Sequence, residues 1–531
     1  MKRIITSLII FTFVCNNISS QHDEARANMN KLFMAYDVIT KLYVDETSNS
    51  KIVEDAIKDM LEKLDPHSSY TDAEETRKMN EPLEANFDGI GIQFNMLIDT
   101  LYVIQVISGG PSEKVGLAAG DRIVMVDNTN IAGVKMVNSD VVKLIRGKKG
   151  TEVNIKVKRG SIPDLLDFKI IRDAIPVYSV DATYMADPKT GYIRLNRFAA
   201  TSLEEFEKAV NELKKKGMKN LILDLQGNGG GYLHISYALA DQFLDEGKLI
   251  VYTEGDKVRR SDAISTKKGL FKEGKVVILV DEASASASEI VSGAIQDWDR
   301  GVILGRRTFG KGLVQRPIQL PDSSMIRLTV ARYYTPSGRF IQKPYEDGDN
   351  ETYNHDVINR YNKGVLMNAD SIHFPDSLKY NTLMSGRTVY GGGGIMPDVF
   401  IPIDSTRNTD YHFRLSRLGL LNKMAMSYVD KNRQNLKRYS NIDRYKDRFV
   451  ITEDMLKELI AMGENEKIEF NEEQFNKSKE FIALQLKALI ARDLFDMSEY
   501  YQVVNDKNNS YQEALRIINN DERYNSILKG N

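Results

Sequence analysis

The sequence predicts a multidomain α/β protein whose strand-and-helix core carries an inserted β domain and has helical regions at both ends. Three observations support this class. Residues 176–344 alternate apolar strands with amphipathic helices, residues from 87 onward form short strands separated by glycines, and residues 25–80 and those after 405 have helical periodicity. At 531 residues the chain is long enough for about three or four domains.

Within the core block, strands are expected at residues 190–195, 221–225 and 276–280, and helices at 202–216 and 232–246. The composition, 42% hydrophobic and 27% charged, is ordinary for a soluble globular protein. A net charge of −2 gives no reason to expect a nucleic-acid-binding surface.

Residues 1–20 have the pattern of a signal peptide. A basic start, Met1-Lys2-Arg3, is followed by an apolar run over residues 4–14 and by the small residues Ser19-Ser20. A membrane span needs about 20 apolar residues, so an anchor is the weaker reading. We therefore expect an exported, periplasmic protein, loosely membrane-bound at most. The single cysteine, Cys15, lies in this leader, and lipid attachment to it stays an open alternative.

Residues 25–86 form the expected N-terminal helical region. Apolar residues recur there at intervals of three and four, from Met29 through Phe33 to Leu42. Pro66-His67 interrupts the pattern.

Residues 87–172 carry a possible peptide-binding site. The turn Gly89-Ile90-Gly91-Ile92 precedes a strand, so its N–H groups can receive a carboxylate while the strand pairs with an extended peptide. Residues 111–117 and Gly120-Asp121 fit a short helix and turn. Together these features resemble a PDZ domain, which implies binding of a free polypeptide C-terminus. The alternative is a small β domain without a ligand.

The core motif is a serine-rich segment between an apolar strand and a helix. Ser284, Ser286 and Ser288 follow the strand 276–280, where α/β enzymes present a nucleophile. A base is needed, and Lys311, isolated between two glycines, fits better than the few histidines. Alternatively, Ser286 and Glu289 form only a helix capping box.

The glycine-rich turn over residues 225–231 suits either a phosphate or an oxyanion. A dinucleotide fingerprint fails because Tyr232 stands where glycine or alanine is needed. A phosphate-binding loop ending at Lys311 also fails, because Gly312 replaces the magnesium-binding Ser or Thr and a strand follows.

Taken in order, these motifs resemble the carboxyl-terminal processing proteases, also called tail-specific proteases. The segments 64–70, 334–338 and 394–398 also match the family, and the resemblance spans about residues 30–402. It implies a serine–lysine protease core over residues 176–402, related to the crotonase and Clp folds. The implied substrates are polypeptides with free, apolar C-termini. The implied enzyme uses no metal and no cofactor.

The resemblance assigns the nucleophile to Ser286, the general base to Lys311 and a supporting amide to Gln315. It places the oxyanion hole at the N–H groups of Gly231 and Ala287. If Lys311 and Gln315 share one strand, they face the same side. To act as a base, the lysine must have its pKa lowered from about 10.4 through burial, and its uncharged flanking residues in sequence are compatible with a buried pocket.

A few other polar residues have two possible roles each. Arg146 fits a regulatory contact between the PDZ domain and the core, or a solvated turn. Asp297 is either an acidic site residue or structural. The histidines, including His67, are dismissed as bases, although His234 follows the glycine turn closely. No Cys/His/Asp cluster has metal-ligand spacing.

Two segments fall outside the resemblance. Residues 345–390 form a polar, irregular insertion, and residues 405–531 a helical region that packs on the core, makes an oligomer contact or binds an adaptor. Two rival functions remain: a tail-binding scaffold with a weak protease core, and a crotonase-type acyl-CoA enzyme. The first would be expected to lack the serine or lysine, and the second needs neither a leader nor a PDZ domain.

Overall fold

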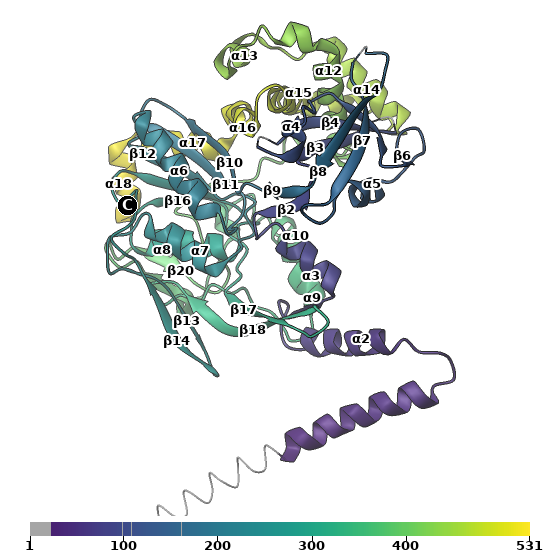
Figure 1. Ribbon diagram of the computed structural model, residues 1–531. Coiled ribbons are helices and arrows are strands. Elements are labelled where there is room, and N and C mark those ends of the chain that lie inside the picture. The colour runs from purple at the N-terminus through teal and green to yellow at the C-terminus, as the bar shows by residue number, and fades with distance from the viewer. Residues whose placement is uncertain (1–22, 98, 108, 161, 531) are drawn as a thin grey trace, which may run out of the picture.

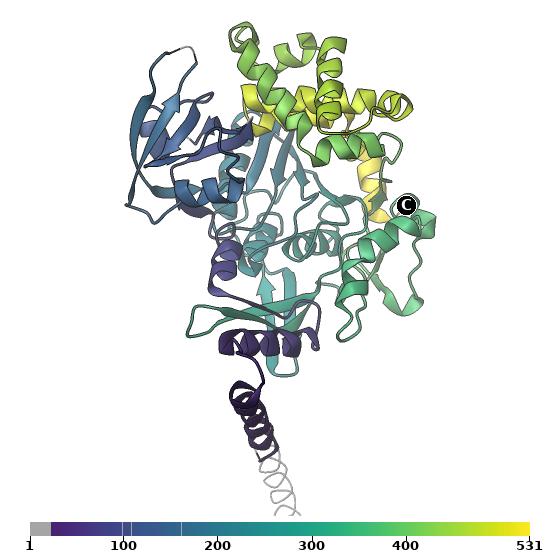
Figure 2. The ribbon, with the colours of Figure 1, turned by 90° about the vertical axis from the view of Figure 1, so that its right-hand side faces the viewer.

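The computed structural model describes residues 23–97, 99–107, 109–160 and 162–530. The expected leader, with Cys15, lies outside these residues. The helix over residues 23–42 projects from the body of the molecule (Figures 1 and 2). No helix in the described ranges is long and apolar enough to span a membrane.

The N-terminal region is helical, as expected, but includes a short strand. Its labelled elements are α2 (Asn49–Glu62), β1 (Ser69–Thr71) and α3 (Ala73–Asn80). The chain leaves α2 before Pro66 and then enters β1, where Tyr70 pairs antiparallel with Ile326 of the core. The residues shortly after Pro66 therefore join a core sheet.

The β domain is a sheet with strand order β3-β4-β5-β7-β8, in which β3 is an edge strand and β6 pairs with β5. Its elements are β2 (Asn86–Gly89), β3 (Ile92–Leu97), β4 (Thr100–Val106), α4 (Pro111–Lys114), β5 (Arg122–Val126), β6 (Thr129–Asn130), α5 (Asn138–Ile145), β7 (Glu152–Lys158), β8 (Leu166–Ile171) and β9 (Asp173–Pro176). β2 and β9 pair with each other, so the chain enters and leaves the β domain through one two-stranded ribbon.

The α/β core contains a six-stranded sheet of order β10-β11-β12-β15-β16-β21, parallel except for β10. Its strands are β10 (Val180–Met185), β11 (Thr190–Leu195), β12 (Asn220–Asp224), β15 (Val276–Val280), β16 (Val302–Gly305) and β21 (Val399–Phe400). The predicted strands at 190–195 and 276–280 are confirmed. The predicted helices appear as α6 (Ser202–Lys215) and the shorter α7 (Leu233–Asp241).

Both faces of this sheet are covered. Val276, Ile278 and Val280 of β15 pack with α6, α7 and α8 (Ala287–Asp297), while Val277 and Leu279 pack against C-terminal residues. Because alternate residues point to opposite faces, this explains why β15 is apolar throughout.

A second sheet has the order β1-β18-β13-β14, with β17 also paired to β18. Its remaining strands are β13 (Leu249–Gly255), β14 (Val258–Ile264), β17 (Leu313–Gln319) and β18 (Met325–Tyr334). β17 begins two residues after Lys311, as the sequence suggests.

The insertion is more ordered than expected. It contains α9 (Asn350–Asn354), α10 (Asp356–Asn362), two 3₁₀ turns (Ala369–Ser371 and Asp376–Leu378) and the hairpin β19 (Lys379–Asn381) and β20 (Thr388–Tyr390). Its order comes from anchors such as Tyr353 and Arg360, which are buried against the core. Composition alone did not reveal them because most other residues are polar.

The C-terminal region is helical, as predicted. It comprises α11 (Asp410–Arg417), α12 (Leu420–Leu436), α13 (Ile442–Arg448), α14 (Glu453–Asn465), α15 (Glu472–Leu494), α16 (Met497–Val504), a 3₁₀ turn (Asn505–Lys507), α17 (Asn509–Ile518) and α18 (Asp521–Lys529). Helices α11 to α16 form their own core beside the β domain (Figure 2), and α17 and α18 pack on the six-stranded sheet.

Candidate active site

Ser286 lies at the start of α8, in a strained backbone conformation. Its φ of 55° and ψ of −111° fall where side chains other than glycine are rare. Such strain is found at strand-to-helix turns that present a nucleophile. The buried strand β15 and helix α8 fix the two sides of this turn.

The three serines of the motif differ in exposure. Ser284 and Ser288 are buried, and their hydroxyls donate to the carbonyls of Leu225 and Asn228, both at 2.8 Å. Ser286 is partly exposed. Of the three, therefore, only the Ser286 side chain reaches the surface.

Glu289 joins the serine segment to the lysine segment. Its buried carboxylate accepts the N–H of Ser286 at 2.8 Å, of Gly310 at 2.7 Å and of Lys311 at 2.9 Å. The Tyr333 hydroxyl also donates to the carbonyls of Lys311 and, at 3.3 Å, Ser286. The expected carboxylate half of the capping box is present, but the same carboxylate also sets the position of Lys311.

Lys311 is partly buried, and burial lowers the pKa of its amine. The positive charge of Arg327 lowers that pKa further, while the carboxylates of Glu289 and Asp65 oppose the shift. The residues that flank the lysine in sequence are uncharged, but its surroundings in the fold are not. The charged groups come from segments distant in sequence.

Gln315 does not share a strand face with Lys311. The lysine precedes β17, and a β-bulge separates Val314 from Gln315. The Gln315 amide donates to the Thr329 hydroxyl at 3.1 Å, and Thr329 donates to Asp65 at 2.9 Å. Within the described residues Gln315 has no hydrogen bond to Lys311, so the expected direct contact is absent.

The glycine turn approaches the serine closely. A Cβ on Gly230 would lie 2.9 Å from the Ser286 Cβ and 3.1 Å from the Ala287 nitrogen, and one on Gly231 would lie 2.2 Å from the Phe198 carbonyl oxygen. Only glycine fits these positions. In the part of the chain that the structure describes, the N–H groups of Gly231 and Ala287 donate to no protein acceptor. Both remain available to a ligand oxygen.

His67 lies closer to the lysine than its sequence position suggested. Burial and the charge of Lys311 lower its pKa to about 3, and its ring nitrogen lies 2.8 Å from the Tyr353 hydroxyl. Its neighbour Asp65 also influences Lys311. Sequence reasoning used this segment only as a family motif and missed that β1 carries it to the site.

The turn Gly89–Ile92 lines a cavity of about 540 Å³ between the edge strand β3 and helix α5. The cavity is also lined by Arg146 and, from the C-terminal region, by Asn422 and Arg492. Arg146 binds Glu81 at 2.6 Å and stacks on Phe87, so it contacts the segment that joins the β domain to the rest of the chain.

Asp297 has the contacts of a structural residue. It is buried and paired with buried Arg339, and it accepts the N–H of Ser337 at 2.9 Å. His234 stacks on Tyr232. The described residues contain no cluster of three or more His, Cys, Asp or Glu that could hold a metal.

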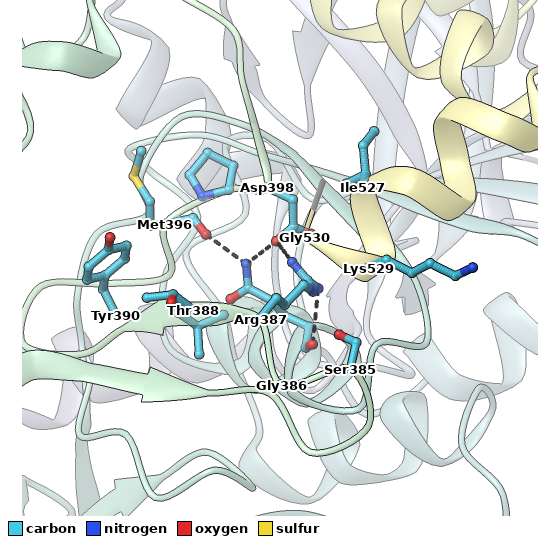
Figure 3. Close-up of a pocket in the computed structure, with 13 residues that line it drawn as sticks. Ser385, Gly386, Arg387, Thr388, Tyr390, Met396, Asp398, Ile527, Lys529 and Gly530 are labelled. Carbon is cyan, nitrogen blue, oxygen red and sulfur yellow. Dashed lines mark hydrogen bonds and ion pairs between the residues drawn. The ribbon is translucent and has the colours of Figure 1, made fainter.

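A separate cavity of about 580 Å³ lies where the insertion meets α18 and the end of α8 (Figure 3). Arg387 is paired there with Asp398 and, at 2.6 Å, with Asp299, and Gln296 donates to Asp398 at 2.7 Å. These charged groups satisfy one another and join the insertion to the core.

Comparison with known proteins assigns these regions. Residues 189–350 match the profile of peptidase family S41, 89–170 that of a PDZ domain, and 13–76 that of the N-terminal domain of the activating protease CtpB. Residues 411–496 match a family of unknown function.

A probable CtpA-like serine protease of Staphylococcus aureus strain N315 is 35% identical over 341 residues, 64% of this chain and 67% of that protein. The Staphylococcus epidermidis protein is 34% identical over 64% of this chain and 68% of its own length.

Two solved structures are also similar. The photosystem II D1 C-terminal processing protease has 26% identity and a TM-score of 0.35, covering 71% of this chain and 94% of that one. The PDZ domain of a Vibrio cholerae carboxy-terminal protease, solved with a peptide, has 31% identity and a TM-score of 0.16, covering 17% and 99%.

The PDZ match and then the S41 match follow one another along the chain, in the order of the PDZ-like turn and the serine and lysine motifs. The staphylococcal serine proteases align over two thirds of their length. The chain therefore belongs to the carboxyl-terminal processing proteases, the CtpA-like serine peptidases of family S41.

Proposed function

We propose that this protease hydrolyses peptide bonds with Ser286 as nucleophile and Lys311 as general base. The observation that carries the proposal is the Glu289 carboxylate, which binds the N–H groups of both residues at 2.8 and 2.9 Å. A neutral Lys311 amine takes the proton of the Ser286 hydroxyl as its oxygen attacks the scissile carbonyl. Burial of the lysine favours that neutral form.

The N–H groups of Gly231 and Ala287 receive the oxyanion of the tetrahedral intermediate. The intermediate collapses to an acyl-enzyme on Ser286 and releases the amine, which takes the proton from Lys311. Water then attacks the acyl group by the same route and frees Ser286. In this scheme Gln315 acts through Thr329 and Asp65, whose charge bears on the lysine.

The PDZ domain recognises the free, apolar C-terminal tail of a polypeptide. The turn Gly89–Ile92 receives the terminal carboxylate, and the open edge of β3 pairs with the preceding residues. Arg146 has a regulatory role, because it connects the groove to Glu81 ahead of the domain. The alternative, a tail-binding scaffold with a weak protease core, would retain this tail recognition without efficient hydrolysis.

Export to the periplasm is proposed from the leader sequence. A homo-oligomer or an adaptor is a further proposal. The helix over residues 23–42 offers a surface for either, since Phe33 and Leu42 are 68% and 76% exposed.

Substitution of the dyad tests the proposal. Ser286→Ala, Lys311→Ala and Lys311→Arg should each lower kcat by about 10³-fold or more in a peptide-hydrolysis assay, and the double alanine variant should be little worse. Ser288→Ala is the matched control, because its buried hydroxyl bonds only to the Asn228 carbonyl in this scheme. If Ser286 serves only as a cap, its alanine variant loses about 1 kcal/mol of stability and stays active.

A further inference from the structure

The C-terminal helical region completes one end of the PDZ groove. Asn422 of α12 and Arg492 of α15 line the same cavity as Gly89–Ile92, although they belong to a different domain. The two domains also touch directly: the Asn95 amide of β3 donates to the Met426 sulfur at 3.4 Å, and Arg122 lies 3.6 Å from Asp430.

These contacts locate Asn422 along the groove. Asn422 lies one turn before Met426 on α12, so both face the same side of the helix. Met426 contacts Asn95, which lies three residues beyond Ile92 on β3. Asp430 of the same helix lies beside Arg122 of β5, and Arg122, Tyr102 and Asn95 lie opposite one another across the sheet. Helix α12 therefore crosses the strands at the level of Asn95, about 10 Å along β3 from Ile92, and carries Asn422 past the edge strand at this end of the groove, where Arg492 binds it.

Arg492 is held in place with donors to spare. Its Nε donates to Asp493 at 2.9 Å, its Nη2 lies 2.8 Å from the same oxygen, and its Nη1 donates to the Asn422 side chain at 3.2 Å. A guanidinium has five N–H groups, so further donors remain for a ligand. Asp493 does not line the groove.

The charge of the groove selects a ligand. The charged side chains that line it, Arg146 near the turn and Arg492 at the far end, are both positive, and no carboxylate lines it among the described residues. A peptide whose carboxylate lies at the turn runs antiparallel to β3, so its upstream residues reach Arg492.

We propose that Arg492 and Asn422 bind an acidic side chain about three or four residues before the C-terminus of the substrate tail. This inference rests on the proposed tail recognition and extends it. It assigns to the C-terminal region a part in choosing substrates: the tail ends in an apolar residue and carries Asp or Glu upstream.

Peptide binding to the full-length Ser286→Ala protein tests the inference. Fluorescent peptides with one apolar terminal residue carry Glu, Gln or Lys at the fourth position from the end, and anisotropy gives their Kd. We expect Glu to bind about two- to fivefold more tightly than Gln, and Lys most weakly, with the differences shrinking at high salt.

Introduced into the Ser286→Ala protein, Arg492→Gln should abolish the preference for Glu. Arg417 is an exposed arginine on α11 of the same domain, and Arg417→Gln should preserve the preference. Because Arg492→Gln leaves Asp493 without its partner, Asn422→Asp provides an independent variant. It adds a carboxylate beside Arg492 and should also remove the preference.

Equal binding of the Glu and Lys peptides, or a preference that survives both Arg492→Gln and Asn422→Asp, would overturn the inference. An amidated Glu peptide separates this from the underlying proposal. If free and amidated peptides bind equally, carboxylate recognition at the turn is wrong. If the free carboxylate matters but the Ser286→Ala protein with Arg492 and Asn422 unchanged shows no preference for Glu, only the role of Arg492 and Asn422 is refuted.

Discussion

The amine of Lys311 is surrounded by charges of both signs, and their balance sets the direction of its pKa shift, on which the proposed role as a base depends. Burial and Arg327 lower its pKa, while Glu289 and Asp65 raise it. Because Glu289 is occupied by backbone N–H groups, its carboxylate positions the lysine backbone as well as acting on the amine. The proposed base role of Lys311 therefore depends on neighbouring groups, which set both the position of the lysine and the pKa of its amine.

We expect kcat/KM to rise with pH through the lowered pKa of Lys311. Below that pKa the amine is protonated and cannot accept a proton, and above it the base is available. His67, with a pKa of about 3, is neutral throughout this range, so no inflection near pH 6.5 should arise from it. A pH–rate profile controlled by an inflection near 6.5 that disappears in His67→Gln would contradict this assignment.

Arg327→Gln should move the same pH profile to higher pH. Removing the positive charge removes one cause of the lowered pKa, so the lysine holds its proton longer. Arg316→Gln, at an exposed position of β17, is the control and should leave the profile unchanged. A shift of the Arg327 variant toward lower pH would show that the charge acts on a different group.

The insertion braces the loop that carries the lysine. Arg360 of α10 donates to the carbonyls of Thr308 at 2.7 Å and Phe309 at 3.1 Å, and the Tyr353 hydroxyl receives the Gln342 amide at 3.0 Å. The residues immediately before Gly310 and Lys311 are thus fixed by a segment that lies later in the chain.

Arg360→Met should lower kcat by about tenfold to a hundredfold with a small change in KM, because the lysine loses its support while the groove remains. Lys363→Met, exposed at the end of the same helix, should have no such effect. Steady-state kinetics with circular dichroism as a folding check measures both. Unchanged kcat in a folded Arg360 variant would mean that the loop before Lys311 keeps its conformation without Arg360.

The sequence predicted what local patterns encode. The apolar run of β15, the periodicity of α6 and the glycines beside Ser286 all have physical requirements that act over a few residues. It did not predict that His67 and Tyr353 meet near Lys311, or that a bulge turns Gln315 away. Those contacts join segments hundreds of residues apart or depend on strand register, and neither leaves a periodic trace.

The proposed tail-binding groove and the proposed nucleophile Ser286 lie on different domains. The PDZ domain is joined through the β2–β9 ribbon, in which Asn86 pairs with Pro176, and it also contacts α12 of the C-terminal region. Helices α17 and α18 tie that region back to the core sheet, where the Tyr524 hydroxyl accepts the Val276 N–H at 3.1 Å. The PDZ domain is therefore connected to the core sheet both through the β2–β9 ribbon and through the C-terminal region.

Tail selectivity should belong to the PDZ domain. A protein substrate with a free apolar tail should be degraded, while the same tail amidated or ending in Asp should be degraded slowly. Because Asn86 and Pro176 are paired, residues 87–172 can be replaced by a short linker, and this variant should lose the distinction. Gel assays of the three tails with each of the two enzymes decide this. A deletion variant that still prefers free tails would place recognition elsewhere.

The serine–lysine assignment is tested most directly by the rate at which a fluorophosphonate, a serine-directed covalent probe, labels the wild-type protein, with the adduct located by mass spectrometry. We expect the adduct on Ser286 and not on the buried Ser284 or Ser288, at a rate that rises with pH and falls at least about 10³-fold in Lys311→Ala. Labelling of another serine, or an unchanged rate without Lys311, would contradict the account.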